Sequence, residues 1–330
     1  MHWATTMTQE KQFFERETIN NTSCQQALLD YICRAITANR QPGIHFPGFY
    51  LGFSSRRIHK DGAEISMPYG IHCADFNGNV NLSALATLAD LGLGSAIRPH
   101  LTDGARLATI TLQMQFSGAL AKSECKIITQ FDGFTEGTSA TLARASGTLF
   151  AAGDLVCHTS GVFANPPVPS GAKIVSIPWR QMAEAQRQTS IPLTDMEDDE
   201  LQIVKSAEFA LQANRQGKSF IERFWGHLPD PGANGSATNT IRIGPHMANR
   251  VGHLQGGILF GIAASTAAAA LPRESVLINA SAWYISAGLG DYLQVRSRAL
   301  QCGKTVAVVL TEVIGKNGRL ALEMITSHGF

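Results

Sequence analysis

The sequence has almost no excess of charge of either sign. Its 27 Lys and Arg residues stand against 26 Asp and Glu residues, which gives a formal net charge of +1 at pH 7. A strong basic excess is the electrostatic signature of nucleic-acid binding, and the totals show none. We therefore expect no nucleic-acid partner, although the totals are compatible with a local basic pocket.

The sequence also lacks long hydrophobic runs. It contains no stretch of about 18 apolar residues that could form a membrane-spanning helix. Its polar first residues, MHWATTMTQEKQFFERET, lack the apolar core of a secretory signal. These two absences predict a cytoplasmic protein with no membrane partner.

Patterns typical of metal, redox and serine hydrolase sites are missing as well. The sequence has no Cys-x-x-Cys, His-x-His, His-Glu-x-x-His or Gly-x-Ser-x-Gly pattern. We expect no metal and no redox cofactor. We expect reduced thiols at the six cysteines, which are Cys24, Cys33, Cys73, Cys125, Cys157 and Cys302.

What the sequence does contain is an internal repeat. The 330 residues, 44% of them hydrophobic, are enough for about two globular domains. The segment HCADFNGNVNLSALATLADLGLGSA from His72 aligns without a gap with HMANRVGHLQGGILFGIAASTAAAA from His246, an offset of 174 residues. Later segments repeat at an offset of 168 residues, with Phe116 opposite Tyr284. Each half therefore follows the same order of elements.

That order is a helix, an extended hairpin, a long apolar helix and a final set of strands. We expect about five strands around one long helix in each half, which is an α+β arrangement. The hairpin segment alternates in polarity and turns at Asp61-Gly62. The predicted helices are 23–40, 81–97, 201–212 and 255–270, the hairpin is 48–69, and the final strands of the second half are 276–286, 291–304 and 305–327, the last with a turn at Asn317-Gly318.

A proline-rich segment, ANPPVPSG at 164–171, separates the halves. We interpret the acidic run from Glu197 to Glu200 as the solvated start of a helix, and LPDPGANGSATN from Leu228 as a flexible loop. The predicted organisation is an N-terminal tail at 1–22, a first domain at 23–164, a linker at 165–199 and a second domain at 200–330.

Asp90 interrupts the apolar helix of the first half. Ser83, Ala86, Thr87 and Gly94 share its helical face. One interpretation is a carboxylate on a stripe of small residues where a ligand can approach, with Ser83 and Thr87 as substrate contacts. The alternative is an ordinary acid on a solvent-exposed face.

The second half carries a complementary feature before its long helix. Asn249-x-x-Gly252-x-x-Gln255-Gly256-Gly257 places a glycine pair at a helix N-terminus. The unpaired N–H groups there suit a developing oxyanion. The alternative is a glycine turn that only lets the helix pack closely.

The two features are distributed asymmetrically. The second half has Ala264 at the position of Asp90, and the first half has Leu82-Ser83 at the position of Gly256-Gly257. Each half keeps what the other lacks. If the two helices pack side by side, one composite site results and its twin has neither part.

The pattern N-x-x-G-x-x-H-G-G followed by a long helix with L-x-D resembles the hotdog-fold acyl-CoA thioesterases of the phenylacetate-pathway (PaaI-like) type. The resemblance covers residues 49–163 and 220–330. It implies a tandem double hotdog, in which each domain is an antiparallel sheet wrapped around a long central helix. The two domains would form an intramolecular pseudo-dimer.

The resemblance also implies roles for individual residues. Asp90 would be the general base for water or the nucleophile on the thioester carbonyl. The N–H of Gly256, with that of Gly257 as a further substrate contact, would polarise the carbonyl oxygen. Asn249 would position water or the thioester, and Gln255 would orient the turn. Thr109 falls where relatives hold the attacking water, and the second half has Leu277 there.

This sequence departs from the family pattern in two places. Gln255 replaces the usual histidine, which removes a titratable group but keeps hydrogen-bonding capacity. The turn of the first half, from Asp75 through Gly78 to Asn81, lacks the glycine pair, which argues against a second site.

The sequence thus predicts an acyl-CoA thioesterase with one composite site and coenzyme A as the carrier. A non-catalytic acyl-CoA binding or sensing module, and a hotdog hydratase or dehydratase, are the alternatives. Further association into a homodimer of double hotdogs is possible for a fused pair. Two alternatives remain for four basic residues: they contact the phosphates of coenzyme A, or they are solvated at the edges of strands. These residues are Arg106, Arg296, Arg298 and Lys304.

Overall fold

The structure is a computed structural model that describes residues 22–41, 45–136, 142–167, 189–213 and 217–330. The expected N-terminal tail and most of the proline-rich linker lie outside the described residues. The first half comprises α2 (Thr22–Asn39), α3 (Phe46–Tyr50), β1 (Ser54–His59), β2 (Gly62–Met67), α4 (Leu82–Ile97), β3 (Ala108–Phe116), β4 (Cys125–Phe134), β5 (Leu142–Ala151) and β6 (Asp154–Ala164). The second half comprises α6 (Asp198–Gln212), α7 (Phe220–Phe224), β7 (Asp230–Pro231), β8 (Ser236–Arg242), α8 (Gly256–Ala269), β9 (Val276–Tyr284), β10 (Tyr292–Cys302), β11 (Val306–Ile314) and β12 (Leu320–Gly329).

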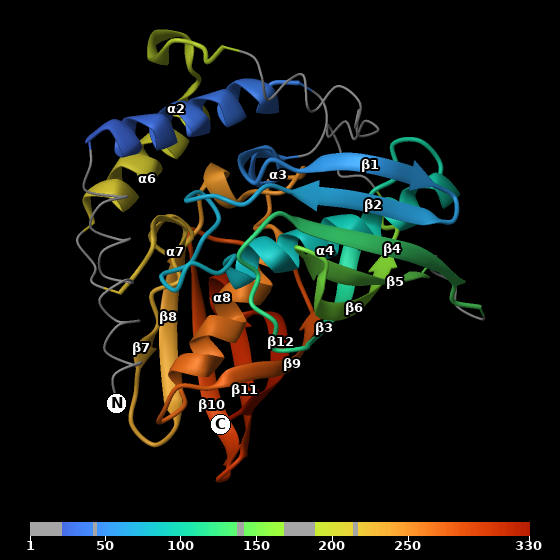
Figure 1. Ribbon diagram of the computed structural model, residues 1–330, viewed down its shortest axis with the longest axis vertical. Helices are drawn as coiled ribbons and strands as arrows, with labels where there is room; N and C mark the ends of the chain where they lie inside the picture. Colours follow the sequence, from blue (N-terminus) through green and yellow to red (C-terminus); the bar gives the residue numbers. More distant parts are fainter. Residues whose placement is uncertain (1–21, 42–44, 137–141, 168–188, 214–216) are drawn as a thin grey trace.

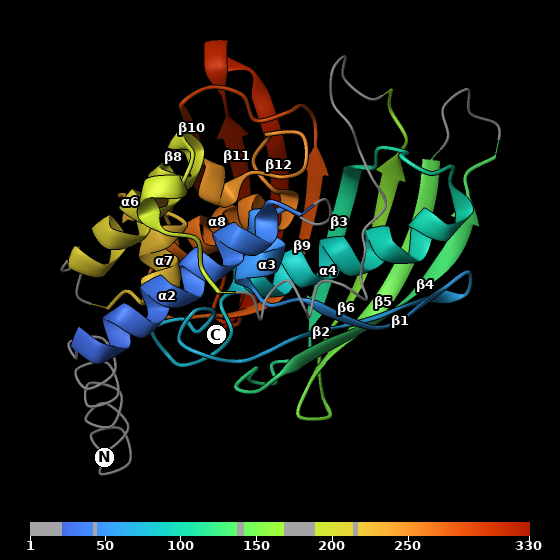
Figure 2. The same cartoon turned by 90° about the horizontal axis from the view of Figure 1, so that it is seen from above.

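All strands belong to one twelve-stranded sheet in the order β1-β2-β4-β5-β6-β3-β9-β12-β11-β10-β8-β7. Every pairing in it is antiparallel, and the halves join where β3 pairs with β9, with Gln113 opposite Ser281. Figure 2 shows the green strands of the first half and the orange to red strands of the second on either side of this junction. Each half contributes six strands, one more than the expected five.

The long helices α4 and α8 lie against the concave side of their own strands and against each other. Each begins at a capping side chain: Asn81 accepts a hydrogen bond from the Ser83 N–H at 2.9 Å, and Gln255 accepts one from the Ile258 N–H at 2.9 Å. The helices approach closely at Gly257, where a Cβ atom would lie 2.3 Å from the Thr87 nitrogen. Only glycine fits this crossing.

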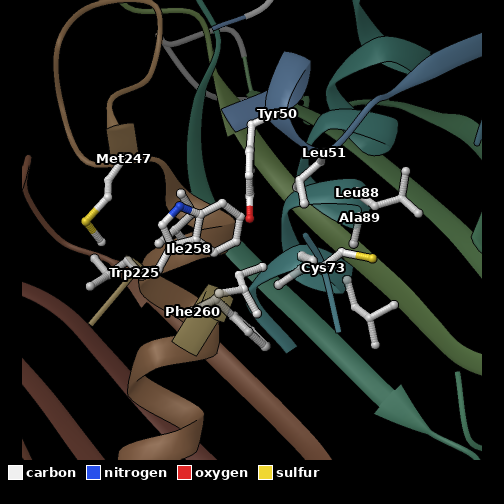
Figure 3. Close-up of a cluster of buried hydrophobic side chains, with 14 of the residues drawn as sticks. Tyr50, Leu51, Cys73, Leu88, Ala89, Trp225, Met247, Ile258 and Phe260 are labelled. Atoms are coloured by element: carbon white, nitrogen blue, oxygen red, sulfur yellow. The ribbon is translucent and has the colours of Figure 1, made fainter. Parts of the chain in front are cut away.

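The hydrophobic core is shared by the two halves. Figure 3 shows Tyr50 and Leu51 of the first half beside Trp225, Met247 and Ile258 of the second, all of them buried. The rings of Tyr50 and Trp225 meet edge to face with centroids 5.7 Å apart. A core of this kind ties the halves into one packed unit.

Helices α2 and α6 pack together beyond the ends of α4 and α8 (Figure 1). The acidic run starts α6 as expected, because the side chains of Glu197 and Glu200 form a capping box with the backbone. Glu200 also accepts two hydrogen bonds from the Arg40 guanidinium of the neighbouring helix segment, at 2.7 and 2.8 Å. This ion pair joins the two halves outside the core.

Three local predictions were wrong. Residues 46–50 form the short helix α3 instead of an extended strand, because Phe46, Phe49 and Tyr50 all point into the core. The hairpin turns at residues 60 and 61, since His59 already pairs with Gly62. The expected loop from Leu228 contains the edge strand β7, where a proline is tolerated.

No helix in the described part of the chain is both long and apolar enough to cross a membrane.

Candidate functional site

A cavity of about 340 Å³ opens where the two halves meet. The first half contributes the C-terminal part of α4 and the start of β3. The second half contributes the loop before α8, the first turn of α8 and the end of β9. The cavity is lined by His45, Asp90, Leu91, Gly94, Arg98, Arg106, Leu107, Ala108, Thr109, Ile110, Phe163, Asn249, Arg250, Val251, His253, Leu254, Gln255, Gly256, Leu259, Tyr284, Ile285, Ser286, Ala287 and Gly288.

Asp90 is the one carboxyl group among these described lining residues. Its Oδ1 accepts a hydrogen bond from the Thr109 hydroxyl at 2.7 Å, and its Oδ2 accepts one from the Gln255 Nε2 at 2.9 Å. Burial raises the pKa of Asp90 to about 6, against the opposing effect of the two hydrogen bonds. At neutral pH the group is mostly an ionised carboxylate of raised basicity, as a general base requires.

The Gln255 side chain links both halves of the site. Its amide nitrogen donates to Asp90 of α4, while its oxygen caps α8 and accepts from the buried Thr87 hydroxyl at 3.2 Å. The amide therefore fixes the position of Asp90 relative to the N-terminus of α8. The expected role of Gln255 in orienting the turn stays a prediction, which this geometry favours.

Gly256 is the first residue of α8, and it lies directly beside Asp90. A Cβ atom at Gly256 would be 3.5 Å from the Asp90 Oδ2. Within the described residues, the Gly256 N–H has no hydrogen-bond acceptor. The N-terminus of α4 is capped one position earlier, because the shorter Asn81 side chain accepts from the second N–H of that helix, at Ser83, whereas Gln255 accepts from the third N–H of α8, at Ile258. A free N–H at a helix N-terminus is suited to an oxyanion or a polarised carbonyl oxygen.

Tyr284 is a site residue that sequence reasoning missed. Its hydroxyl donates to the Gly256 carbonyl oxygen at 2.8 Å, so it holds the first turn of α8 in place. Burial and the negative charge of Asp90 keep the pKa of this phenol above its usual value. The signal was present in the repeat, where Phe116 of the first half has no hydroxyl to match it.

Asn249 lines the cavity, but its side-chain oxygen is occupied within its own loop. It accepts hydrogen bonds from the N–H groups of Val251 and His253, both at 3.0 Å. In the first half, the Asp75 carboxylate likewise accepts hydrogen bonds from the N–H groups of Asn77 and Asn79. The shared turn explains why an Asx residue stands at both positions, and it leaves only the amide nitrogen of Asn249 for a substrate.

Three expected substrate contacts lie away from the cavity wall. Ser83, Thr87 and Gly257 are fully or almost fully buried where α4 crosses α8. The Ser83 hydroxyl donates to the Ile258 carbonyl, and the Thr87 hydroxyl donates to the Ser83 carbonyl. Small residues serve the close helix crossing here, so the interpretation of this stripe as a ligand approach is corrected. Only Gly94 of the stripe borders the cavity.

The region related to the site by the repeat has no counterpart of the carboxylate. Ala264 is buried at the position of Asp90, and Leu277 replaces Thr109. The neighbouring Ser83 hydroxyl is bonded to the buried His227 ring at 2.7 Å. Burial lowers the pKa of His227 to about 3, so the ring is neutral.

Of the four basic residues considered for phosphate contacts, only Arg106 lines the cavity. Arg296, Arg298 and Lys304 are exposed on or just beyond β10, away from it. In the described residues, no group of three or more His, Cys, Asp or Glu side chains is arranged to hold a metal ion.

Comparison with known proteins identifies the fold. No protein-family model and no curated protein matches the chain. Among solved structures, a candidate thioesterase from Novosphingobium aromaticivorans is 15% identical, with a TM-score of 0.52 over 84% of this chain and 98% of that chain. A candidate oleoyl thioesterase from Lactobacillus plantarum is 10% identical, with a TM-score of 0.51 over 81% and 95%.

A hotdog-fold protein of unknown function from Alicyclobacillus acidocaldarius is 11% identical, with a TM-score of 0.51 over 86% of this chain and 97% of that chain. Likeness at this level of identity establishes the fold and not the reaction. The chain has a hotdog fold.

Proposed function

We propose that the protein is an acyl-CoA thioesterase of PaaI-like type with one composite site. It hydrolyses an acyl-CoA thioester to the free acid and coenzyme A. The observation that carries this proposal is the meeting, in one cavity, of the Asp90 carboxylate of α4 and the unpaired Gly256 N–H of α8. The description of two similar structures as candidate thioesterases supports the same reaction class.

In the proposed architecture, residues 23–164 and 200–330 are two hotdog domains joined by the linker at 165–199. They form an intramolecular pseudo-dimer in which β3 and β9 pair. The repeat, the two central helices and the likeness to solved structures over more than four fifths of the chain support this division. Each domain supplies one part of the site, so neither works alone.

In the proposed reaction, the Asp90 carboxylate removes a proton from water while the water oxygen attacks the thioester carbonyl carbon. The carbonyl oxygen becomes an oxyanion that accepts a hydrogen bond from the Gly256 N–H. When the intermediate collapses, the C–S bond breaks and the thiolate leaves with the proton that Asp90 had accepted. Thr109 and Gln255 hold the carboxylate in place, and the chemistry uses no metal or redox cofactor.

Direct attack by the Asp90 carboxylate on the carbonyl carbon is the other proposed pathway. It would give a mixed anhydride between enzyme and acyl group, which water then hydrolyses. Hydrolysis in ¹⁸O-water under single-turnover conditions identifies an anhydride whose aspartyl carbonyl is attacked by water, because the label then enters Asp90, whereas the general-base pathway places the label in the free acid alone.

The test of the function is thiol release from short, medium, long and aromatic acyl-CoA esters. Wild-type protein is expected to turn over at least one ester, and Asp90→Asn is expected to lose at least about a hundredfold in kcat/KM. Asp132→Asn, an exposed acid on β4, is the matched control and keeps wild-type activity. Binding of acyl-CoA without turnover by wild type would instead indicate a binding or sensing module.

A further inference from the structure

The cavity beside Asp90 contains more basic groups than the neutral composition of the chain would suggest. Among the described lining residues, three arginines and two histidines accompany the single carboxyl group. The three arginines concentrate positive charge in a concave, partly buried wall, and such a concentration attracts anions. The basic residues are His45, Arg98, Arg106, Arg250 and His253.

The cavity follows one face of α4 away from Asp90. Asp90, Gly94 and Arg98 are spaced four residues apart and all line it. At 1.5 Å per residue, the Cα atom of Arg98 lies about 12 Å along the helix axis from the Cα atom of Asp90. Gly94 keeps the space between them open, because a Cβ atom there would contact only the Leu107 Cδ1, at 3.8 Å. An elongated group with one end at Asp90 therefore extends toward Arg98.

Arg98 has little compensation for its charge in the described structure. Its Nη1 donates to the Ala105 carbonyl oxygen at 3.3 Å, and the ion pairs between described residues involve other side chains. Burial lowers the pKa of Arg98 to about 10, so it stays charged at neutral pH. A guanidinium that is largely shielded from solvent, and most of whose five N–H donors have no acceptor in the described structure, is stabilised by an anion.

His45 lies at the same part of the cavity. Among the described residues, its buried Nδ1 has no hydrogen-bond partner. Burial, together with the nearby charges of Arg250 and Arg98, lowers the pKa of His45 to about 4. The ring is therefore neutral at pH 7 and can offer one N–H to a ligand beside the guanidinium.

We infer that the acyl group of the substrate ends in a carboxylate, which Arg98 and His45 bind while its thioester lies at Asp90. This inference rests on the proposed thioesterase function and narrows its substrates to mono-thioesters of dicarboxylic acids. The apolar side chains of Leu91, Leu107 and Leu259, which also line the cavity, suit the methylene groups between the two ends. Hydrolysis adds water across the C–S bond only, and the distal carboxylate is unchanged.

Phosphate groups of the carrier are the other possible source of an anion. We assign the acyl carboxylate because Arg98 is largely withdrawn from solvent, where a small monoanion fits better than a hydrated diphosphate. Arg106 and His253 are two further basic residues that line the same cavity.

The test compares glutaryl-CoA with valeryl-CoA, two esters of equal chain length that differ in the terminal group. Wild type is expected to favour glutaryl-CoA by at least about tenfold in kcat/KM, the scale of a hydrogen bond to a charged group. Arg98→Met is expected to abolish this preference by lowering turnover of the glutaryl ester alone. Arg242→Met, which removes an exposed arginine on β8, is the matched control and keeps the preference.

Three further measurements make the test decisive. Calorimetric binding of the non-hydrolysable thioether analogues of both esters separates the inference from the reaction, because the preference should appear in binding even without turnover. Repeating the pair as N-acetylcysteamine thioesters removes the phosphates, and the effect of Arg98→Met should persist. Arg98→Lys keeps a positive charge and should retain part of the preference if Arg98→Met does not fold.

Equal turnover of the two CoA esters and equal binding of their analogues would overturn the inference while leaving thioester hydrolysis intact. An effect of Arg98→Met that disappears with the N-acetylcysteamine esters would also overturn it, and would assign Arg98 to phosphate. Turnover of neither ester, with tighter binding of the carboxylate analogue, would contradict the reaction and support the carboxylate site.

Discussion

Asp90 has the raised basicity that the proposed general base requires. Its two hydrogen-bond donors come from different halves of the chain, Thr109 from β3 and Gln255 from the start of α8. Burial raises the pKa of Asp90, and the two donors limit that rise. These opposing effects set the pKa of Asp90 at about 6, so that near neutral pH the group is ionised and still accepts a proton readily.

The first prediction concerns pH. In the proposed reaction the ionised form of Asp90 is the active one, and its pKa is about 6, so kcat/KM is expected to rise with pH through 6 and level off above it. Thr109→Val removes a hydrogen bond that favours the carboxylate, so the rising limb moves to higher pH and activity below pH 6 falls roughly threefold to tenfold. Thr109→Ser keeps the hydroxyl and serves as the control. A rising limb that Thr109→Val leaves in place would count against this role.

The second prediction isolates one N–H group. Gly256→Pro removes the N–H at the first helical position, where proline fits, and Gln255 before it already has the extended backbone that proline requires, with φ −66° and ψ 133°. Gly256→Ala adds bulk but keeps the donor. We expect Gly256→Pro to lose about a hundredfold more kcat than Gly256→Ala. Equal losses in the two variants would assign the effect to crowding against Tyr284.

Part of the site was predictable residue by residue, and part was not. The repeat exposed Asp90, Thr109 and Gly256 because each differs from its partner in the other half, and the structure brings them together. Arg98 and His45 carried no such signal, since only packing brings them to the same cavity.

At the scale of elements, the crossing of α4 and α8 explains why small residues were misread. Small side chains on a helix face look alike in sequence whether they admit a ligand or another helix. Gly257 and Gly94 illustrate the two cases, because a Cβ atom would lie 2.3 Å from the Thr87 nitrogen in the first and 3.8 Å from Leu107 in the second. The distinction depends on tertiary contacts that a helical wheel does not contain.

This contrast gives a prediction of stability. Gly257→Ala is expected to lower the free energy of unfolding by at least about 2 kcal/mol, because the helices must separate to admit the methyl group. Gly94→Ala is expected to raise it by up to about 1 kcal/mol through its better helix propensity. Urea unfolding of both variants measures the difference. An unchanged free energy of unfolding in Gly257→Ala would mean that α4 and α8 approach each other less closely than the 2.3 Å contact indicates.

Short elements were the least predictable part of the fold. The long helices and the main strands of each half follow from the repeat and from hydrophobic periodicity, and α4 and α8 begin within one residue of their expected positions. The five-residue helix α3 and the two-residue strand β7 depend on neighbours far along the chain. Local sequence alone does not specify them.

At the scale of the whole molecule, the asymmetry of the repeat is matched by asymmetry in space. The cavity forms where α4 provides the acid and α8 provides the Gly256 N–H, whereas the related region has Ala264 at the position of Asp90 and Leu82-Ser83 at the position of the glycine pair. In the proposed account, one chain therefore carries the parts for one site. A non-hydrolysable acyl-CoA analogue is expected to bind with a stoichiometry of one per chain in calorimetric titration, and a value of two would contradict the single-site account.

The central claim is that a thioester carbonyl lies between Asp90 and Gly256. A crystal structure of the protein with a ketone analogue of acyl-CoA, in which a methylene group replaces the sulfur, tests it most directly. We predict that the ketone oxygen accepts a hydrogen bond from the Gly256 N–H at about 2.7–3.1 Å and that the carbonyl carbon faces the Asp90 carboxylate. An analogue bound elsewhere, or with its carbonyl turned away from Gly256, would contradict the account.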